Sequence, residues 1–357
     1  MQTIVERHPG LTPPDRRAEL LREPGFGKVF TDHMAMAWWR DGEWTAPRIT
    51  PRRPLALDPA AAVLHYAQEI FEGMKAYRTE EGEVLLFRPE VNAKRFARSA
   101  ERMAMPQVPE ALFSAAVEAL IRTDRDWIPS GEGSLYLRPF MIATEAFLGV
   151  RPATEYLFCV LACPVGAYFK GGAKPVTVWA STTFTRAAAG GTGAAKCGGN
   201  YAGSLIAQAE AIRHGCDQVV FLDAAEHRWI EELGGMNVFF LVDGTLITPP
   251  LTGTILEGVT RSSLLTLARE EGLKVEERPY DFETLKADAA SGRLTEAFAC
   301  GTAAVVAAIG EVRHAAGAFA IAGGVEGPVT STLRRRLTDI QRGQAPDPHG
   351  WTRRVQL

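Results

Sequence analysis

A segment rich in glycine and alanine near the middle of the chain places one lysine in an unusual chemical setting. Lys196 lies in AAAGGTGAAKCGGNY, where small residues on both sides leave room for a bulky planar ligand and bring no charge that would solvate the amine. A desolvated lysine has a lowered pKa and can attack a carbonyl carbon. Taken alone, a lysine in a glycine loop is more often an ordinary surface residue, so the rest of the sequence has to decide.

Pyridoxal phosphate (PLP) is a cofactor that such a lysine binds, and it needs further partners from the protein. Its pyridine nitrogen needs an acid, its phosphate a cradle, and its ring hydroxyl a hydrogen bond or a stacking group. Glu232, in IEELGGMN, could pair with the protonated pyridine nitrogen through a charge-assisted hydrogen bond. With Glu231 beside it, the same residue taken alone is more easily explained as part of a solvated acidic turn.

Two short segments and one arginine could bind the phosphate of this cofactor. Gly258-Val259-Thr260 opens a predicted helix, whose backbone N–H groups and dipole favour an anion. Gly301-Thr302 forms a second turn of small residues, and Arg95, on a predicted helix that follows Pro89, could add a fixed cation. Helix starts and helical arginines are common, so each of these features is weak evidence by itself.

The hydrophobic pattern predicts the elements that must position these residues. Apolar residues at helical spacing predict helices over 89–105, 111–127, 201–214 and 258–272, the last two stopped by Gly215 and Gly272. Strand-like runs cover 27–39, 81–88, 134–145, 155–169, 175–182, 217–224 and 274–280. The Asp243-Gly244 pair between the apolar runs of 236–248 predicts a β-hairpin.

The alternation of strands and helices indicates an α/β (α+β) fold, although it does not give the order of the strands. At 357 residues the chain exceeds the usual size of one core, so two domains are expected. The segment KGGAKP is rich in glycine and proline and is typical of a linker. We therefore predict a small N-terminal α/β domain with an N-terminal arm over 1–169, an interdomain linker over 170–176 and a large cofactor-binding domain over 177–357.

Composition and charge exclude several classes of protein. A hydrophobic fraction of 46% and a charged fraction of 23% are close to globular averages, and a net charge of -3 gives no field that suggests nucleic acid as a partner. No apolar run approaches the roughly twenty residues of a membrane span, and the charged N-terminus does not resemble a signal peptide. The five cysteines lack CxxC spacing, which predicts reduced thiols without a disulfide framework or a metal site. We expect a cytoplasmic protein that binds small molecules and neither nucleic acid nor membrane.

Eight sequence blocks in order resemble the branched-chain amino acid aminotransferases, which are PLP enzymes of fold type IV. They are FGKVFTDHM, LHYAQEIFEGMKAYR, LYLRPF, CPVGAYF, GTGAAKCGGNYAGSL, EELGGMNVFF, LEGVTRSSLL and SGRLTEAFACGTAAVV. The resemblance covers nearly the whole chain. It implies the two-domain fold type IV architecture with mixed sheets, and PLP as the cofactor.

The resemblance also implies roles for individual residues. Lys196 would be the catalytic Schiff-base lysine and proton shuttle, Tyr201 would bind the ring hydroxyl, and Glu232 the pyridine nitrogen. The phosphate would be held by Arg95, Val259, Thr260 and Thr302. The substrate-binding positions match Phe26, Tyr66, Phe71, Tyr136, Arg138, Tyr168, Ala303 and Ala304. In the family the tyrosine that matches Tyr66 comes from the partner subunit, so a homodimer is implied.

The chain departs from the vertebrate members of the family at two places. Gly235 stands where those members have a threonine three residues after the pyridine-binding glutamate, so a hydroxyl near the substrate carboxylate is absent. Residues 304–307, Ala-Val-Val-Ala, replace the redox CxxC of vertebrate mitochondrial members, so no thiol switch is expected there.

The resemblance implies ping-pong transamination between leucine, isoleucine or valine and 2-oxoglutarate, which yields branched 2-oxo acids and glutamate. Two other fold type IV enzymes, D-amino acid aminotransferase and aminodeoxychorismate lyase, are rival interpretations. They are typically shorter, whereas this chain has FGKVFTDHM and LYLRPF. A PLP-fold protein without catalytic activity is a third alternative, which the presence of Lys196 and Glu232 disfavours.

Overall fold

The computed structural model describes residues 3–166 and 174–357, and the chain divides into two compact units. Unit 1 comprises Met1–Tyr168, Ala195–Gly198 and Asp339–Leu357, and unit 2 comprises Phe169–Ala194 and Gly199–Thr338. The segments 195–198 and 339–357 thus cluster with unit 1, although the sequence analysis assigns both to the C-terminal domain. Most of the predicted linker, 170–176, lies outside the described residues, and the predicted domain boundaries stay predictions.

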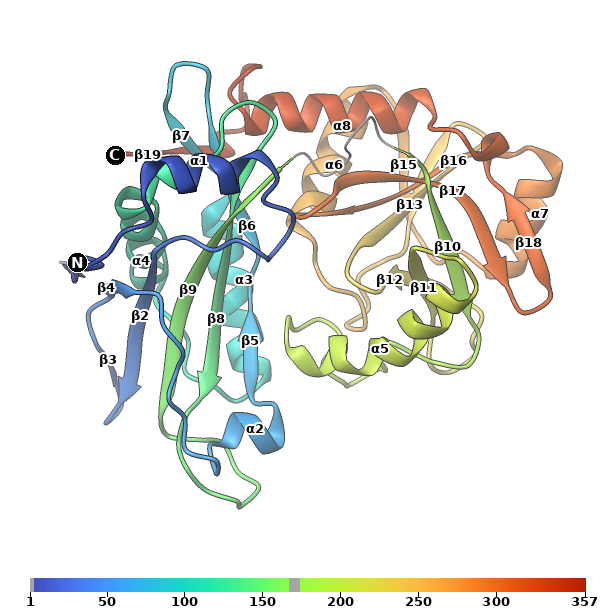
Figure 1. Ribbon diagram of the computed structural model, residues 1–357. Coiled ribbons are helices and arrows are strands. Elements are labelled where there is room, and N and C mark those ends of the chain that lie inside the picture. Colours follow the sequence, from blue (N-terminus) through green and yellow to red (C-terminus); the bar gives the residue numbers. More distant parts are fainter. Residues whose placement is uncertain (1–2, 167–173) are drawn as a thin grey trace. The chain divides into compact units, whose positions relative to one another are not determined.

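Unit 1 is built on a ten-stranded sheet with the order β1-β4-β2-β9-β8-β6-β7-β19, in which β3 pairs with β2 and β5 with β8 (Figure 1). Its long central pair, β8 and β9, is antiparallel, and β8 carries two of the predicted substrate residues, Tyr136 and Arg138. The strands are β1 Ile4–Val5, β2 His33–Arg40, β3 Glu43–Trp44, β4 Arg48–Pro51, β5 Glu69–Phe71, β6 Met74–Arg78, β7 Val84–Phe87, β8 Ser134–Ala143, β9 Tyr156–Val165 and β19 Thr352–Val355.

Two helices cover the sheet of unit 1 and form its core. Phe96 of α3, Phe113 of α4 and Phe158 of β9 are fully buried, and their ring centroids lie 5.5 to 5.8 Å apart. Pro89 begins α3 because its fixed φ suits the first helical turn and its missing N–H has no partner to lose there. The helices of this unit are α1 Pro14–Arg22, α2 Ala62–Tyr66, α3 Pro89–Arg102, α4 Glu110–Thr123 and the 3-10 turn η1 Arg125–Trp127.

Unit 2 contains a nine-stranded mixed sheet with the order β12-β11-β10-β17-β16-β13-β14-β15, and β18 pairs with β17 (Figure 1). The Asp243-Gly244 pair joins β13 to β14 in the predicted hairpin, and both residues have positive φ, 47° and 74°, as a two-residue type I′ turn requires. The strands are β10 Val176–Ser181, β11 Gln218–Leu222, β12 Ile230–Leu233, β13 Asn237–Val242, β14 Thr245–Thr248, β15 Lys274–Glu277, β16 Leu294–Gly301, β17 Val305–His314 and β18 Gly317–Ala320.

The remaining helices begin or lie in unit 2. Gly215 and Gly272 follow the ends of α5 and α6 with positive φ, the conformation that the sequence analysis expects of these stop signals. The helices are α5 Gly198–Arg213, α6 Val259–Glu270, α7 Phe282–Ser291, η2 Ala322–Gly324 and α8 Pro328–Gln341. Within the described ranges, no helix has the length and apolar character needed to cross a lipid bilayer.

Candidate active site

Lys196 lies in unit 1, and its backbone is held on both sides. Its N–H donates to Ser99 Oγ on α3 at 3.0 Å, and its carbonyl oxygen accepts from the N–H of Phe71 at 2.9 Å. The Lys196 amine lies 4.8 Å from the centre of the Phe71 ring. Two residues later, the N–H of Gly198 donates to the Glu69 carboxylate, and a Cβ at this position would lie 2.0 Å from Glu69 Oε1. A side chain at Gly198 would therefore displace the Glu69 carboxylate from its present position.

Helix α3 presents a polar stripe to the same region of unit 1. Asn92, Arg95 and Ser99 are spaced three and four residues apart, so they share one helical face, and all three are buried. Glu72, whose exposed fraction is 0%, accepts from Arg95 Nε at 2.7 Å and Nη2 at 2.8 Å, and from Asn92 Nδ2 at 2.8 Å. Burial raises the pKa of the Glu72 carboxyl, but the charge and hydrogen bonds of Arg95 outweigh burial, and the net pKa is lowered. Arg95 is thus fixed by a buried carboxylate.

Four of the predicted substrate residues come together on one face of β8. Tyr136 and Arg138 alternate with Leu137, so both point the same way, and Arg138 Nη2 donates to the Tyr136 hydroxyl at 3.0 Å. The Arg138 guanidinium lies 4.8 Å from the Phe71 ring centre, and the Phe26 ring lies edge-on to Tyr136 at 5.0 Å. A cavity of about 270 Å³ opens here. Its lining residues are Phe26, Gly27, Phe30, Tyr136, Arg138, Leu161, Ala162 and Cys163.

The remaining predicted substrate residues lie elsewhere or outside the described ranges. Tyr66 ends α2 in unit 1, where its hydroxyl donates to the carbonyl of Leu148. Ala303 and Ala304 form the turn between β16 and β17 in unit 2. Tyr168 falls within 167–173 and so lies outside the residues that the structure describes.

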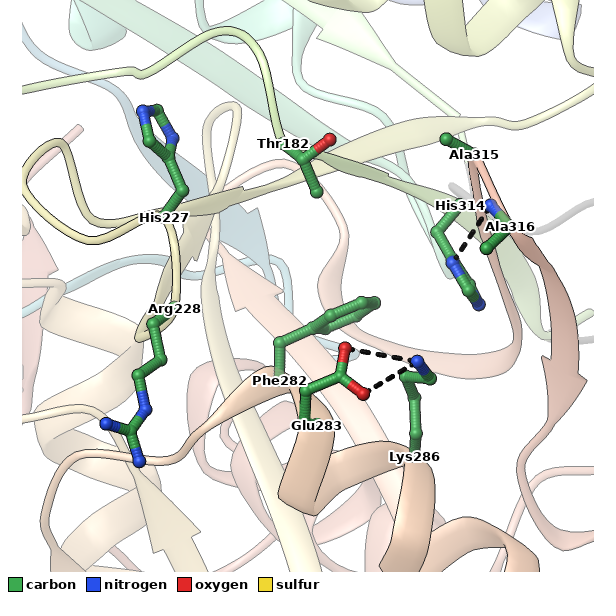
Figure 2. A pocket seen from close by; sticks show the side chains of 9 residues that line it. All are labelled: Thr182, His227, Arg228, Phe282, Glu283, Lys286, His314, Ala315 and Ala316. Carbon is green, nitrogen blue, oxygen red and sulfur yellow. Dashed lines mark hydrogen bonds and ion pairs between the residues drawn. The ribbon is translucent and has the colours of Figure 1, made fainter.

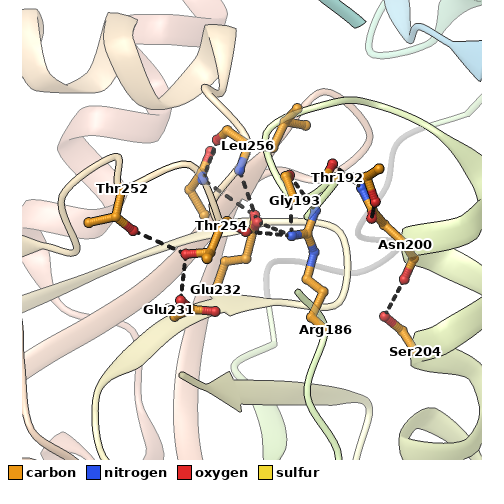
Figure 3. Close-up of polar contacts among 11 residues, drawn as sticks. Arg186, Thr192, Gly193, Asn200, Ser204, Glu231, Glu232, Thr252, Thr254 and Leu256 are labelled. Carbon is orange, nitrogen blue, oxygen red and sulfur yellow. Dashed lines mark hydrogen bonds and ion pairs between the residues drawn. The ribbon is translucent and has the colours of Figure 1, made fainter. Parts of the chain in front are cut away.

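Glu232 is a buried residue of β12 in unit 2, so its interpretation as part of a solvated acidic turn is wrong. Its exposed fraction is 2%. Its Oε1 pairs with Arg186 Nη1 at 2.8 Å and accepts from the N–H of Leu256 at 3.0 Å (Figure 3). Its Oε2 lies 3.5 Å from Asn237 Nδ2, which also donates to the Leu256 carbonyl at 3.0 Å. A strand, two loops and a buried arginine thus fix the carboxylate.

The two segments that were predicted to bind the phosphate form a helix start and a turn, as the sequence indicated. Gly258 is the N-cap of α6, which begins at Val259, and a Cβ on Gly258 would lie 2.0 Å from Asn237 Oδ1. The absence of a side chain therefore lets the helix start approach Asn237 closely. Thr260 is buried in the first turn of α6, and Thr302 lies in the turn after β16.

Tyr201 lies close to the turn that follows Glu232. It is on the first turns of α5, and a Cβ built on Gly235 would lie 3.7 Å from its ring atom Cε1. Unit 2 therefore brings together the residue predicted for the ring hydroxyl and the turn at which this chain departs from vertebrate members.

Comparison with known proteins identifies the family. The model of the amino-transferase class IV family matches residues 69–312. A probable branched-chain-amino-acid aminotransferase of Streptomyces coelicolor is 56% identical over 338 residues, which is 94% of this chain and 93% of the relative. The branched-chain-amino-acid aminotransferase of Mycobacterium tuberculosis H37Rv is 54% identical over 347 residues, covering 95% and 94% of the two chains.

The chain belongs to the branched-chain-amino-acid aminotransferases of class IV. The solved structure of the Escherichia coli branched-chain amino acid aminotransferase superposes with a TM-score of 0.75 at 28% identity, over 90% of this chain and 99% of that one. The Thermobaculum terrenum enzyme in its PLP form gives a TM-score of 0.74 at 26% identity, over 92% and 99%. The fold type IV prediction is confirmed, and the chain is a PLP-dependent transaminase.

Unit 2 also contains a hollow of about 330 Å³ away from Glu232 (Figure 2). Phe282 forms part of the wall of this hollow. The charged side chains that line the hollow are paired with other residues of the chain. Lys286 Nζ lies 2.8 Å from Glu283 Oε2, and Arg228 pairs with Asp281. These pairs already neutralise the charges, so the hollow is assigned no ligand. Across residues 3–166 and 174–357, no group of three or more His, Cys, Asp or Glu side chains is arranged to bind a metal ion.

Sequence reasoning missed several polar residues that support this site. Glu72, Ser99 and Arg186 each contact a predicted site residue, and neither Glu72 nor Arg186 has a local signal of its own. The spacing of Asn92, Arg95 and Ser99 on one face of a helix was visible in the sequence. An otherwise apolar helical face that carries polar residues at positions i, i+3 and i+7 would have indicated a buried polar contact.

Proposed function

We propose that this aminotransferase transfers the amino group between leucine, isoleucine or valine and 2-oxoglutarate, with PLP bound to Lys196. The single observation that carries the proposal is the environment of Lys196. Its backbone is fixed by Ser99 and Phe71, and the centre of the Phe71 ring lies 4.8 Å from the Lys196 amine and 4.8 Å from the Arg138 guanidinium. A nucleophile held rigidly beside an aromatic pocket with one cation suits an amino acid substrate.

The donor set supports PLP as the group bound by these residues. Glu232 offers a buried carboxylate for a protonated ring nitrogen, and Tyr201 a phenol for the ring hydroxyl. The start of α6 at Val259 and Thr260 offers backbone N–H groups to a phosphate. Arg95 and Thr302 would complete the phosphate contacts. When bound, PLP supplies a reactive carbonyl carbon and a ring that accepts electrons from the substrate α-carbon.

The chain's own residues would then perform the proton transfers and bind the substrate. With PLP bound, the Lys196 Nζ would act as the base that takes the proton from the substrate α-carbon and would hold this proton until it is returned. Glu232 keeps a proton on the ring nitrogen. Phe26, Phe71 and Tyr136 exclude water from the aliphatic side chain of the substrate.

The same pocket must accept both an aliphatic side chain and the carboxylate of glutamate or 2-oxoglutarate. Arg138 Nε is buried and has no hydrogen-bond partner among the described residues. A buried N–H of this kind favours a ligand that accepts a hydrogen bond. We therefore assign the second carboxylate of the acidic substrates to Arg138.

We further infer that the enzyme acts as a homodimer. Unit 1 exposes a group of apolar side chains on α2 and on the loop that follows β8. Their exposed fractions are 59% for Leu64, 38% for Tyr66, 66% for Leu148 and 90% for Val150. Burial of such a group against a second copy would remove apolar surface from water. A homodimer would also place Tyr66 at a subunit interface, where the family resemblance expects it.

A cytoplasmic location is proposed from the cysteines. All five are free thiols and all are buried, which suits a reducing compartment.

The experiment that tests the proposed reaction is a panel of amino donors with 2-oxoglutarate, followed by the formation of glutamate. We expect leucine, isoleucine and valine to be used, and D-alanine and aminodeoxychorismate to be inert. A D-amino acid preference, or release of pyruvate from aminodeoxychorismate, would instead support one of the two rival fold type IV enzymes.

A further inference from the structure

Arg186 is a buried cation of the candidate site that the proposed reaction does not yet use. Its exposed fraction is 6%, and it lies in the loop after β10 (Figure 3). Its guanidinium donates to the carbonyl oxygens of Thr254 at 2.9 Å and Gly193 at 3.4 Å, and it pairs with Glu232 at 2.8 Å. One side chain thus joins its own loop, the loop that leads to α6 and the strand that carries Glu232.

The loop around Arg186 is tightly packed, so its position is well defined. A Cβ on Gly193 would lie 2.4 Å from the Thr254 carbonyl oxygen and 2.7 Å from Ala187 Cβ. Only glycine therefore allows the loop to approach Thr254, and this approach brings both carbonyl oxygens within reach of the guanidinium. The Arg186 fork is preorganised before any ligand binds.

Of the described groups near the Glu232 carboxylate, Arg186 is the one whose positive charge stabilises the ionised form. Cys300 on β16 interacts with Glu232, but burial raises the pKa of this thiol far above its usual range, so it stays neutral. Glu231, the neighbour on β12, accepts a hydrogen bond from Thr254, and burial raises the pKa of its carboxyl. Asn237 carries no charge. Among these groups, Arg186 is the cation that forms an ion pair with Glu232.

A carboxylate that shares a proton with a pyridine nitrogen must be the weaker base of the two if the proton is to stay on nitrogen. A buried carboxylate without a cation is a stronger base, because burial disfavours its charged form. A guanidinium bonded to one oxygen stabilises the anion and lowers its basicity. Here Oε1 accepts from both Arg186 and the Leu256 N–H, which directs these donors to one side of the carboxylate.

We propose that Arg186 is a positioning residue of the cofactor site, which fixes the Glu232 carboxylate and keeps the shared proton on the pyridine nitrogen of PLP. This inference rests on the proposed role of Glu232. It assigns to Arg186 an electronic effect that is exerted through Glu232, without contact to the substrate. The proton is transferred between one carboxylate oxygen and one ring nitrogen, and no other co-reactant is needed.

The test is the ¹⁵N chemical shift of the ring nitrogen in enzyme loaded with ¹⁵N-labelled PLP, which reports directly whether that nitrogen is protonated. We expect a protonated nitrogen in the wild type and in Arg186→Lys, which retains the charge. Arg186→Gln retains hydrogen-bonding capacity but is neutral, and its signal should move toward the unprotonated position. Residues that orient metal ligands typically contribute roughly 10- to 100-fold to activity, and by analogy the first half-reaction should slow by about that factor in Arg186→Gln.

Two further variants separate this effect from a general loss of structure. Arg334→Met removes a half-buried guanidinium that pairs with Glu326 in the same unit and should leave the nitrogen signal unchanged. In Glu232→Gln, the additional change Arg186→Gln should have little further effect on the signal, because the effect of Arg186 is transmitted through Glu232.

The outcomes distinguish the two proposals. Identical nitrogen signals for Arg186→Lys and Arg186→Gln, both at the wild-type position, would overturn the role of Arg186 while the role of Glu232 stands. An unchanged signal in Glu232→Gln would overturn the role of Glu232 itself, and with it the inference. If the Arg186→Gln enzyme binds PLP poorly, the signal is recorded at saturating cofactor, and the Lys-to-Gln comparison still decides.

Discussion

Gly73 and Tyr136 form a contact in unit 1 that permits no side chain at position 73. A Cβ on Gly73 would lie 2.3 Å from the Tyr136 hydroxyl oxygen and 3.1 Å from Cζ of the same ring. Lys75, two residues further along, pairs in register with Tyr136 across β6 and β8. The Tyr136 hydroxyl, which accepts a hydrogen bond from Arg138, thus packs directly against the backbone of Gly73.

Gly73→Ala should therefore displace Tyr136 and disturb its hydrogen bond with Arg138. We expect a loss of stability of about 1 to 3 kcal/mol, the usual cost of overpacking. A misplacement near 1 Å in the pocket should lower kcat/KM by up to about 10²-fold. Thermal unfolding and steady-state kinetics measure the two effects.

The matched controls are Gly10→Ala and the double variant Gly73→Ala/Tyr136→Phe. A Cβ on Gly10 meets nothing within 4 Å, so Gly10→Ala should behave as the wild type. Removal of the hydroxyl in Tyr136→Phe should recover part of the stability lost in Gly73→Ala. A Gly73→Ala variant that equals the wild type in both measurements would show that the pocket tolerates the methyl group.

Lys196 should be the lysine that carries the cofactor, and a second lysine of the same unit provides an internal control. Lys75 in the same unit is buried, whereas Lys196 is partly exposed, and burial, followed by the charge of Arg342, lowers the pKa of the Lys75 amine to about 8. Borohydride reduction of the PLP-loaded enzyme and peptide mapping should place the pyridoxyl label on Lys196 and leave Lys75 unlabelled. A label on Lys75 would refute the assignment of Lys196.

The elements that local chemistry determines were predicted well from the sequence. Asp243-Gly244 supplies two positive φ values at the centre of a hairpin, and Pro89 starts α3 at its first residue. Both depend on neighbouring residues alone. The helix over 258–272 and its stop at Gly272 agree with α6 for the same reason.

The parts of the site that depend on distant partners were not predictable in this way. Glu232 lies in a strand and pairs with Arg186, 46 positions earlier in the chain, and neither residue indicates the other by its local pattern. The helices α1, α2, α7 and α8 were also missed. The sequence of α8, PVTSTLRRRLTDIQ, does carry a helical signal, because Leu333, Leu337 and Ile340 recur at helical spacing and are buried.

Gly235→Thr should test whether the missing hydroxyl affects substrate affinity. A Cβ at this position would lie 3.7 Å from the Tyr201 ring, which is an ordinary contact, so the side chain should fit. A hydrogen bond to a charged carboxylate contributes about 1.5 to 3 kcal/mol, so KM for the amino acid should fall by roughly 10-fold or more. Gly235→Val has nearly the same shape without the hydroxyl and should not lower KM. Equal KM values in the two variants would show that the hydroxyl is not needed in this enzyme.

Arg138→Met should separate the acidic from the aliphatic substrates. Arg138 donates through Nη2 to the Tyr136 hydroxyl and lies 4.8 Å from the Phe71 ring centre, while its buried Nε has no partner among the described residues. The second carboxylate of glutamate would supply that partner. Loss of the cation would leave the carboxylate partly buried and unpaired, at a cost on the order of 2 to 4 kcal/mol.

The expected consequence differs between the two half-reactions. kcat/KM for glutamate and 2-oxoglutarate should fall by roughly thirty-fold to several hundred-fold, whereas leucine and its oxo acid should change much less, because they offer the arginine no second carboxylate. The two half-reactions must be followed separately by single-turnover absorbance of the cofactor, since overall turnover hides which half has failed. Equal losses for both substrate classes would instead mean that Arg138 binds the α-carboxylate common to all substrates, or supports Tyr136, and its assignment to the second carboxylate would be wrong.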